Sequence, residues 1–426
     1  MLYKTRNDAL RTHLQWILSV LLCFPAVAAV AAGTVGSGTP GSCTEAAFDA
    51  ALTGGGAVDF DCGPAPVSIV LTSTKNISSD TTIDGGGLVT LDGNGGSFYL
   101  FNLIGNANFS VSNLVLRNAG GAISGNTGDI TIESCTISDH SGSGNAAINA
   151  SGTLEIFDSL ITRNTYTGSG PGAGIKSTAG TLTIIDSEIS DNVQQNGGGA
   201  GVFIGGDAEI WNTLFIGNDG GVSPDGALRN DGTTRIFNST FTGNIAASGG
   251  GAIWNTGSLE IYNSTIAGNA GHAITGTGAV GLVNTIIAGN DLNCSGSIVD
   301  VGGNLQFGGS QPTSCGATMP VADPLLDVLA DNGGPTRTMA LLPGSPAIDA
   351  GINVLCPPVD QRGVTRPQGP ACDIGAFELE AGTGTLPPPA VVPVLSPWGL
   401  AMLIAMLAGF GMLWVHRRRA FPQAPD

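Results

Sequence analysis

The sequence predicts an all-β protein built around a parallel β-helix, a solenoid in which every coil adds one short strand to each sheet. A nine-residue phrase recurs at intervals of 21 to 28 residues and begins at Ile132, Ile156, Ile184, Ile210, Ile236, Ile261 and Leu282. A period in the twenties with no helical pattern inside it is typical of a solenoid. The composition agrees, because 67 of 426 residues are Gly and only 11% are charged, which favours short strands between turns over helices.

The first 32 residues predict a secretory signal peptide (1–32). Three basic residues come before an apolar run, 14–30, that ends in small residues typical of a cleavage site. We expect cleavage near 28–33 and export of the remaining chain. Lipid attachment at Cys23 is the alternative, and the bulky Leu22 before it disfavours that interpretation.

The cysteine content agrees with export, because disulfides persist in oxidising compartments. Six of the eight cysteines can pair in many ways, and proximity in the sequence favours Cys43–Cys62, Cys294–Cys315 and Cys356–Cys372. Cys135 occupies a position of the repeat that is otherwise Ser or Thr. We therefore expect it to be a buried thiol rather than a nucleophile.

The chain is strongly acidic, with a net charge of −18. Such a surface repels nucleic acid and anionic membranes and tolerates cations or neutral glycans. We therefore expect no nucleic-acid partner and no cofactor, with Ca²⁺ the one ion that acidic positions would accept.

The nine positions of the phrase define columns that stack from coil to coil. The first and sixth columns are apolar and are predicted to point into the core. The ninth column is His140 followed by asparagines, which predicts a ladder of amides at a left-handed turn, with His140 as a structural member. A second motif, such as "GGAIWNTG" at 250–257, supplies another inward layer, so each coil carries at least two strands and a third is expected.

The third column contains the best catalytic candidates, Asp158 and Asp186. On adjacent coils these carboxylates would lie about 5 Å apart, a separation that retaining glycosidases use and that Ca²⁺ accepts. The column is otherwise Asn with one Ser, however, and turn geometry alone explains that composition. The two aspartates therefore remain weak candidates.

The second column predicts a binding surface, because strand alternation turns it outward when the first column points inward. Its aromatic members would form an exposed stripe able to hold sugar rings or a protein partner, unless they only pack against one another as a cross-strand ladder. These residues are Phe157, Trp211, Phe237 and Tyr262.

The repeats, with "TTIDGGGLVTLDGNGG" at 81–96 as an early coil, resemble the right-handed parallel β-helix proteins of the pectin lyase-like superfamily. The resemblance implies a single-stranded β-helix of about ten coils over 67–318. The stretch at 48–63 looks like the amphipathic N-terminal cap (33–66) that covers the open end of such a solenoid. Enzymes of that superfamily use a Lys or Arg base beside Ca²⁺-binding carboxylates, or clustered Asp with His, and no such constellation is recognisable here.

Residues 319–380 abandon the repeat and resemble a choice-of-anchor Q domain. The similarity rests on "DNGG" at 331–334, "GSPAIDAG" at 344–351, "DQRG" at 360–363 and "CDIGAFE" at 372–378. We expect a loop-rich C-terminal cap, locked by ion pairs between its arginines and aspartates. The candidate pairs join Arg362 or Arg366 to Asp349, Asp360 or Asp373.

The C-terminus resembles an IPTL-CTERM sorting domain. A Pro-rich linker and motif (381–396) come before a predicted transmembrane helix (397–416) and a basic cytoplasmic tail (417–426). Val392, Val394 and Pro397 depart from the usual motif. The resemblance implies processing by an exosortase-type membrane peptidase, and the matching residues are Pro393, Leu395, Ser396, Trp398, Gly399, Arg417, Arg418 and Arg419.

Together these features predict an exported passenger that is anchored in the inner membrane, or released after C-terminal processing. We expect a non-catalytic role at the cell surface or envelope, such as adhesion or glycan binding. The alternative is a polysaccharide lyase or glycoside hydrolase acting outside the cytoplasm.

Overall fold

The computed structural model describes residues 31–381, apart from residues 126, 145, 223–224, 248 and 312–313. The described residues therefore exclude the predicted sorting motif, transmembrane helix and basic tail. Of the predicted signal peptide they include only Ala31 and Ala32, which begin the first strand. None of the helices in the described part is long and apolar enough to cross a membrane.

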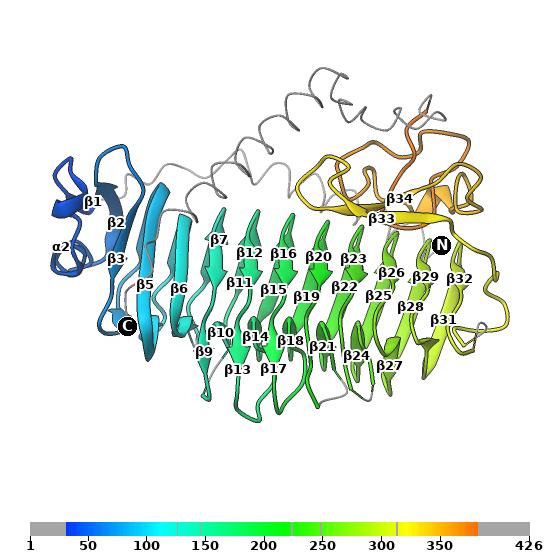
Figure 1. The fold of residues 1–426 in the computed structure, drawn as a ribbon, viewed down its shortest axis with the longest axis horizontal. Helices are drawn as coiled ribbons and strands as arrows, with labels where there is room; N and C mark the ends of the chain where they lie inside the picture. The colour runs from blue at the N-terminus through cyan, green and yellow to red at the C-terminus, as the bar shows by residue number, and fades with distance from the viewer. Residues whose placement is uncertain are drawn as a thin grey trace, which may run out of the picture. The chain divides into compact units, whose positions relative to one another are not determined.

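The described chain is a stack of about ten coils, and each complete coil contributes one strand to each of three parallel ladders (Figure 1). This confirms the parallel β-helix and the expected third strand. Strands β5 (Thr81–Leu103) and β6 (Phe109–Gly125) each pass through all three ladders.

The first ladder contains β1 (Ala31–Gly36), β2 (Gly56–Asp61), β7 (Ile130–Glu133), β11 (Leu154–Phe157), β15 (Thr181–Ile185), β19 (Asp207–Trp211), β22 (Thr233–Phe237), β25 (Ser258–Tyr262), β28 (Ala279–Val283) and β31 (Ser297–Gly302). The second ladder contains β3 (Val67–Val70), β8 (Thr136–Ser138), β12 (Leu160–Thr162), β16 (Glu188–Ser190), β20 (Leu214–Ile216), β23 (Thr240–Thr242), β26 (Thr265–Ala267), β29 (Ile286–Ala288) and β32 (Leu305–Phe307). The third ladder contains β4 (Lys75–Ile77), β10 (Ile148–Ala150), β14 (Ile175–Ser177), β18 (Val202–Ile204), β21 (Leu228–Asn230), β24 (Ile253–Asn255), β27 (His272–Gly276) and β30 (Leu292–Cys294).

Two small sheets lie outside these ladders. The first joins β9 (Ser141–Gly142), β13 (Thr165–Tyr166) and β17 (Val193–Gln194), and the second pairs β33 (Leu326–Ala330) with β34 (Thr338–Leu341). The short helices are η1 (Pro40–Ser42), α2 (Glu45–Ala51) and η2 (Asn353–Leu355).

The core of the solenoid consists of the columns that were predicted to point inward. Every residue of the first and sixth columns is 0% exposed, as are the inward residues of the third ladder from Ile123 to Ile274. Phe215 stacks on Phe241 of the next coil with ring centroids 4.3 Å apart. Residues from the same position of the repeat contact one another along the solenoid axis, so the repeat produces a continuous apolar core.

The N-terminal end of this core is closed by α2. Thr44 caps the helix by accepting the Ala47 backbone NH at 3.2 Å. Phe48 is 0% exposed and contacts the ring of Phe101 below it, with centroids 6.2 Å apart. The Cys43–Cys62 disulfide joins the cap to the residue that follows β2, so the open end of the core is covered as a solenoid requires.

The ninth column forms the predicted asparagine ladder. Asn218 donates from Nδ2 to Asn244 Oδ1 at 3.0 Å, while its own Oδ1 accepts Asn192 Nδ2 at 3.0 Å. Asn218 Nδ2 also donates to Ile189 O at 2.8 Å. The side chains are at most 2% exposed, so each coil satisfies the buried polar groups of its neighbours.

His140 begins this ladder as a structural residue. Its Nδ1 accepts the Ala119 NH at 3.3 Å, so Nε2 carries the proton and lies 3.1 Å from Leu116 O. Burial lowers the pKa of His140 to about 4, and the ring is therefore neutral at physiological pH.

One detail of the ladder prediction is wrong. The left-handed residues belong to the third and eighth columns rather than to the ninth. The eighth column is Asp, Arg or Gly, from Asp139 (φ 60°) to Gly289 (φ 63°). The turn is made by the residue before the asparagine, which leaves the amide free to point inward.

The predicted loop-rich C-terminal cap is also corrected. The end of the solenoid is closed by residues 314–321, which the Cys294–Cys315 disulfide fastens. Gln306 Nε2 donates to Met319 O at 3.0 Å, and Met319 is 2% exposed in the main core. Residues 323–380, the C-terminal segment, lie instead along the side of the later coils (Figure 1).

A second apolar core joins the C-terminal segment to the solenoid. Outward-facing side chains of the second ladder meet buried side chains of the segment in this core. The contributing residues are Ala267, Ile286, Ala288 and Leu305 of the ladder, with Leu341, Ala347, Ile374 and Phe377 of the segment. The outward residues Ile286 and Leu305 are apolar in these last coils, so covering them with the segment removes apolar surface from water.

The asparagine ladder predicts a position-specific loss of stability. Replacing Asn218 by Ala leaves the amides of Asn192 and Asn244 and the carbonyl of Ile189 without their partner. We expect the free energy of unfolding in urea to fall by about 2–3 kcal/mol.

The exposed Gln195→Ala variant, which lies in the corner loop after β17, serves as the control and should change stability by less than about 0.5 kcal/mol. Equal stability of the two variants would show that the ladder does not hold the coils together.

Candidate functional site

Both weak catalytic candidates lie at the first corner, the turn between the first and second ladders. Asp158 has φ 46° and Asp186 has φ 53°, and the equivalent residues of the neighbouring coils also have positive φ. Asx side chains tolerate this conformation better than others. The position of both aspartates is thus accounted for by the turn that they make.

The carboxyl of Asp186 lies in a partly buried environment. It is half-buried and its Oδ1 accepts Asn212 Nδ2 at 2.9 Å. Burial raises its pKa, and the charge of Asp158 acts in the same direction. Asp158 itself is exposed. Two neighbouring carboxyls in unlike environments are therefore present on this face.

The change from Asp to Asn along the third column has a structural cause. Asn238 Nδ2 donates to Val359 O at 2.9 Å, Asn263 Nδ2 to Asp373 O at 3.3 Å and Asn284 Nδ2 to Ile352 O at 3.3 Å. These acceptors belong to the C-terminal segment, and an ionised Asp cannot donate to them. Three of the asparagines in this column therefore donate to the segment, whereas Asn212 donates to Asp186.

The predicted aromatic stripe is present and faces outward. Trp211 pairs in register with Phe237, and Phe237 with Tyr262. Their rings stack with centroids 3.9 Å and 4.8 Å apart. Phe157 lies on the same face but is separated from Trp211 by Ile185 of the intervening coil.

The stripe is less open than the sequence suggested. Phe237 is only 4% exposed, and Trp211 and Tyr262 are half-buried. Stacking on both neighbours covers the two faces of the Phe237 ring. A ligand would therefore contact the edges of Trp211 and Tyr262 rather than a row of free ring faces.

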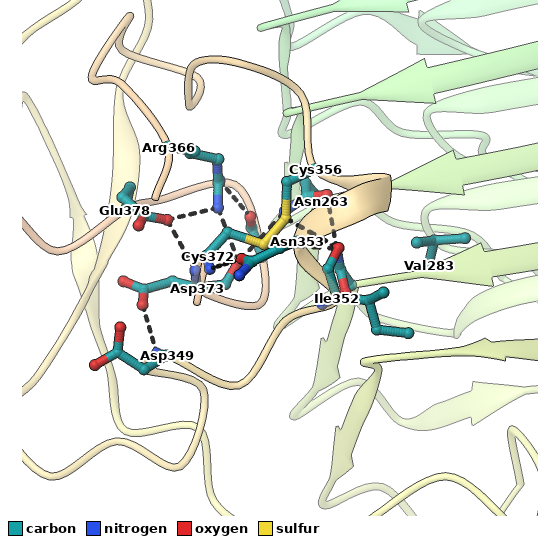
Figure 2. The surroundings of a disulfide bond; sticks show 12 residues. Asn263, Val283, Asp349, Ile352, Asn353, Cys356, Arg366, Cys372, Asp373 and Glu378 are labelled. Carbon is teal, nitrogen blue, oxygen red and sulfur yellow. Dashed lines mark hydrogen bonds and ion pairs between the residues drawn. A yellow bond between two sulfur atoms is a disulfide. The ribbon is translucent and has the colours of Figure 1, made fainter. Parts of the chain in front are cut away.

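The C-terminal segment lies against the first corner over several coils. Thr336 donates to Asn212 O at 2.8 Å, and Arg337 lies 3.1 Å from Glu188. Farther along, Gln361 accepts Thr240 Oγ1 at 2.7 Å. Figure 2 shows the Cys356–Cys372 disulfide directly beside Asn263. The stripe thus runs beside a wall formed by residues far away in the sequence.

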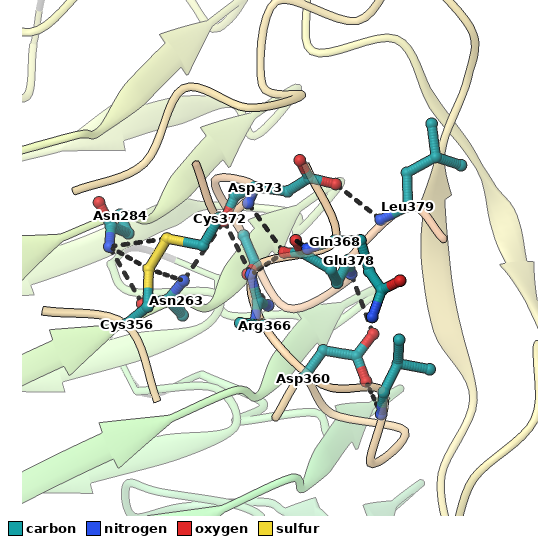
Figure 3. Close-up of polar contacts among 12 residues, drawn as sticks. Asn263, Asn284, Cys356, Asp360, Arg366, Gln368, Cys372, Asp373, Glu378 and Leu379 are labelled. Carbon is teal, nitrogen blue, oxygen red and sulfur yellow. Dashed lines mark hydrogen bonds and ion pairs between the residues drawn. A yellow bond between two sulfur atoms is a disulfide. The ribbon is translucent and has the colours of Figure 1, made fainter. Parts of the chain in front are cut away.

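A buried ionic cluster holds the segment together (Figure 3). Arg366 Nη1 is 3.0 Å from Glu378 Oε2, and these two side chains are 0% and 1% exposed. Arg366 also donates to Asp373 O at 2.8 Å and to Gly375 O at 2.7 Å. Glu378 accepts the Gln368 NH at 2.8 Å. Such dense internal bonding offsets the cost of burying the charges.

The arginine–aspartate pairing was predicted only in part. Arg362 does pair with Asp360, at 2.8 Å, and its guanidinium lies 3.7 Å from the Phe377 ring centroid. Arg366 pairs with Glu378 instead of an aspartate. Burial raises the pKa of Asp373 to about 6, although its two oxygens accept the backbone NH groups of Asp349 and Leu379.

Cys135 and the groups that could bind a metal ion were also part of the sequence-based expectations. Cys135 is 2% exposed, and burial raises its pKa to about 11, which agrees with an inert thiol. Within the described ranges, the His, Cys, Asp and Glu side chains form no group of three or more that could hold a metal ion. The sorting-motif residues lie outside the described part.

Comparisons with known proteins give a likeness of fold. No family model matches the sequence, and no curated protein matches it. Among solved structures the chain is similar to one titled "Crystal structure of pectate lyase Pel9A", with a TM-score of 0.47 and 17% identity, covering 78% of this chain and 90% of that chain. At this distance the likeness concerns the parallel β-helix alone.

The ionic cluster predicts a local effect of one isosteric change. Glu378→Gln leaves the buried Arg366 guanidinium without its counter-charge, which costs about 3–5 kcal/mol in comparable buried pairs. We expect the C-terminal segment to be cut by protease at lower urea concentrations than in the wild type while the solenoid remains intact, as read by mass spectrometry of the fragments.

Glu380→Gln is the matched control, because Glu380 lies 3.7 Å from Arg362 with a side chain that is 52% exposed. Identical digestion of the two variants would contradict the structural role of the Arg366–Glu378 pair.

Proposed function

We propose that this chain is an exported β-helix passenger, anchored through its C-terminus, with a non-catalytic role at the cell surface or envelope such as adhesion or glycan binding. One observation carries the proposal. The charged and acidic groups of the first corner and the C-terminal segment are engaged in turns and in internal bonds. Because these groups stabilise the scaffold, we assign the function to the exposed surface beside them, which includes the aromatic stripe.

Export is supported by the disulfides and by the sequence of the chain ends. The three disulfides fasten the N-terminal cap, the C-terminal end of the solenoid and the C-terminal segment. Disulfides in all three of these parts are typical of a protein that functions outside a reducing compartment. The signal-like N-terminus and the sorting-like C-terminus support the same interpretation from the sequence.

Binding at the stripe is supported by its chemistry. Trp211 and Tyr262 are half-buried, and the Tyr262 hydroxyl donates to Glu260 at 3.2 Å. The polar edges of these aromatic side chains, beside a carboxylate, suit the hydroxyl groups of a sugar. The wall formed by the C-terminal segment gives the stripe one defined side.

Trp211→Ala should weaken binding to the natural surface or glycan by about tenfold if the stripe is used, because a central aromatic anchor dominates such contacts. Trp254→Ala, a half-buried tryptophan on the third ladder, is the control and should bind as the wild type does. Binding to immobilised polysaccharide or whole cells measures the effect, and unchanged binding of Trp211→Ala would remove the stripe from the proposal.

Anchoring and processing have a separate test. Mass spectrometry of the protein isolated from its native membrane or medium should give a mature C-terminus near the motif at 393–399. A variant with Arg417, Arg418 and Arg419 replaced by Gln removes the basic cluster after the predicted membrane span, and we expect less of the chain to carry the mature C-terminus. An intact C-terminus ending at Asp426 would show that the chain is not processed.

A polysaccharide lyase or hydrolase is the second candidate, and the raised pKa of Asp186 beside Asp158 favours it. It predicts chain cleavage when the protein is incubated with acidic or neutral polysaccharides, with or without Ca²⁺. Asp186→Asn retains an acceptor for Asn212 and would abolish such cleavage. Reproducible cleavage by the wild type with loss in Asp186→Asn would overturn the non-catalytic proposal.

A further inference from the structure

One lysine of the first coil occupies an inward position of the third ladder. Lys75 of β4 pairs in register with Phe101, which is 0% exposed and belongs to the apolar column that continues with Ile123. The Lys75 side chain is accordingly only 4% exposed. Burying an ammonium group is costly unless that group is paired, so packing alone does not explain a lysine at this position.

The amine of Lys75 contacts two carboxylates of the N-terminal cap. Its Nζ lies 2.7 Å from Glu45 Oε1 and 2.6 Å from Asp49 Oδ1. Both acidic residues belong to α2, and a spacing of four residues places them on the same face of that helix. One ammonium is therefore shared by two carboxylates at the junction of the cap and the first coil.

The two carboxylates have unlike environments. Glu45 is held more firmly, because its Oε1 accepts the Thr72 NH at 2.7 Å and its Oε2 accepts Thr72 Oγ1 at 2.8 Å. Burial acts to raise the pKa of Glu45, but the hydrogen bonds from Lys75 and Thr72 outweigh burial and lower that pKa. Glu45 is thus ionised and able to accept a proton. The Asp49 side chain is 50% exposed, so a small molecule released from it has a path to solvent.

We propose that Lys75 and Asp49 join in an intramolecular isopeptide bond, with Glu45 as the proton carrier. Glu45 takes one proton from the Lys75 ammonium, and the neutral amine attacks the Cγ atom of Asp49. A C–N bond forms and one C–O bond of the carboxyl breaks. The oxygen leaves as water, with one proton returned by Glu45 and a second lost from Nζ. One ammonium and one carboxylate thus become one amide and one water, with no oxidant or reductant.

Proximity and local charge both favour this condensation. Well-oriented groups within one molecule react with effective concentrations on the order of 10⁵–10⁸ M, which offsets the tendency of water to hydrolyse an amide. The bond also removes the charges of Lys75 and Asp49. Glu45 remains as a single charge that accepts from Thr72 and from the new amide NH, which is a better balance than one buried cation between two anions.

Aromatic side chains cover the amine from the core side. Phe48 lies on α2 between the two acids, and its ring centroid is 5.8 Å from that of Phe60 and 6.2 Å from that of Phe101. Because Phe101 pairs directly with Lys75, these rings keep bulk water away from the attacking nitrogen. The reacting groups therefore meet where apolar side chains hold them in place.

The bond fixes the cap independently of its disulfide. Cys43–Cys62 joins the cap to the end of β2 in the first ladder, whereas Lys75 joins it to β4 in the third ladder. The cap consequently stays attached to the first coil when the disulfide is reduced. This property concerns the maturation of the chain and goes beyond the proposed role at the cell surface.

Tryptic digestion of the denatured and reduced full chain tests the proposal. Lys75 is the one site for trypsin between Arg11 and Arg117, and trypsin does not cleave after a lysine whose amine is acylated. The wild type should give a peptide that runs uncut through Lys75 to Arg117, with a mass one water molecule below the sequence value. Fragmentation of this peptide should place the link between Asp49 and Lys75.

Three variants assign the roles. Asp49→Ala removes the carboxyl and Lys75→Met removes the amine, so neither should lose water. Glu45→Gln keeps both partners without the proton carrier, and its linked fraction at a fixed time after synthesis should fall about tenfold or more. Formation of the Cys43–Cys62 disulfide in Glu45→Gln, read before reduction, confirms that the cap of this variant is folded.

Lys176→Met is the matched control, because Lys176 is the other lysine of the described chain and lies on the outward side of the third ladder. It should lose water as the wild type does. Cleavage of the wild type after Lys75 at full mass would overturn the proposal, as would a link to Glu45 in place of Asp49. Complete linkage in a folded Glu45→Gln variant would refute the role of Glu45 as the proton carrier.

Discussion

The structure depends on register between coils. Each coil presents one row of backbone groups and one buried amide to the next, and an asparagine such as Asn218 both accepts from the coil before it and donates to the coil after it. A shift of one residue would bring polar groups against the apolar columns and leave the buried amides unpaired. This constraint explains why the same residues recur in the same columns, and why the interior tolerates so little variation.

Freedom of sequence is consequently confined to outward columns and corners, and the functional candidates all lie there. The first corner carries Asp158 and Asp186 in coils where the C-terminal segment makes no bond to the third column, and asparagines where it does. The second corner changes length between coils, with eight residues between Asn244 and Ile253 but four between Asn269 and Ile274. The scaffold therefore provides rigid positions, and the local length and polarity of each corner decide what it can bind.

The C-terminal segment changes the character of the first corner. Its ionic cluster is internal, with Arg366 and Glu378 almost fully buried, and its apolar residues complete a second core with the later coils. The aromatic stripe is partly closed by stacking within the solenoid itself, and the segment adds a wall beside it. This arrangement favours edge-on contact with a ligand and gives the proposed surface role a defined geometry.

The sequence alone determined the solenoid, its inward columns, the asparagine ladder and the outward direction of the aromatic stripe, because each follows from a periodic pattern that neighbouring coils repeat. It also indicated the three disulfides through proximity. Only the tertiary structure decided that residues 323–380 cover a side rather than an end, that Arg366 pairs with Glu378, and that Phe237 is buried. The apolar outward residues Ile286 and Leu305 belong to that side contact, but Leu214 occupies an equivalent outward position in an earlier coil, so this pattern was no signal by itself. Its meaning depended on a partner far away in the chain, and such long-range contacts leave no period in the sequence.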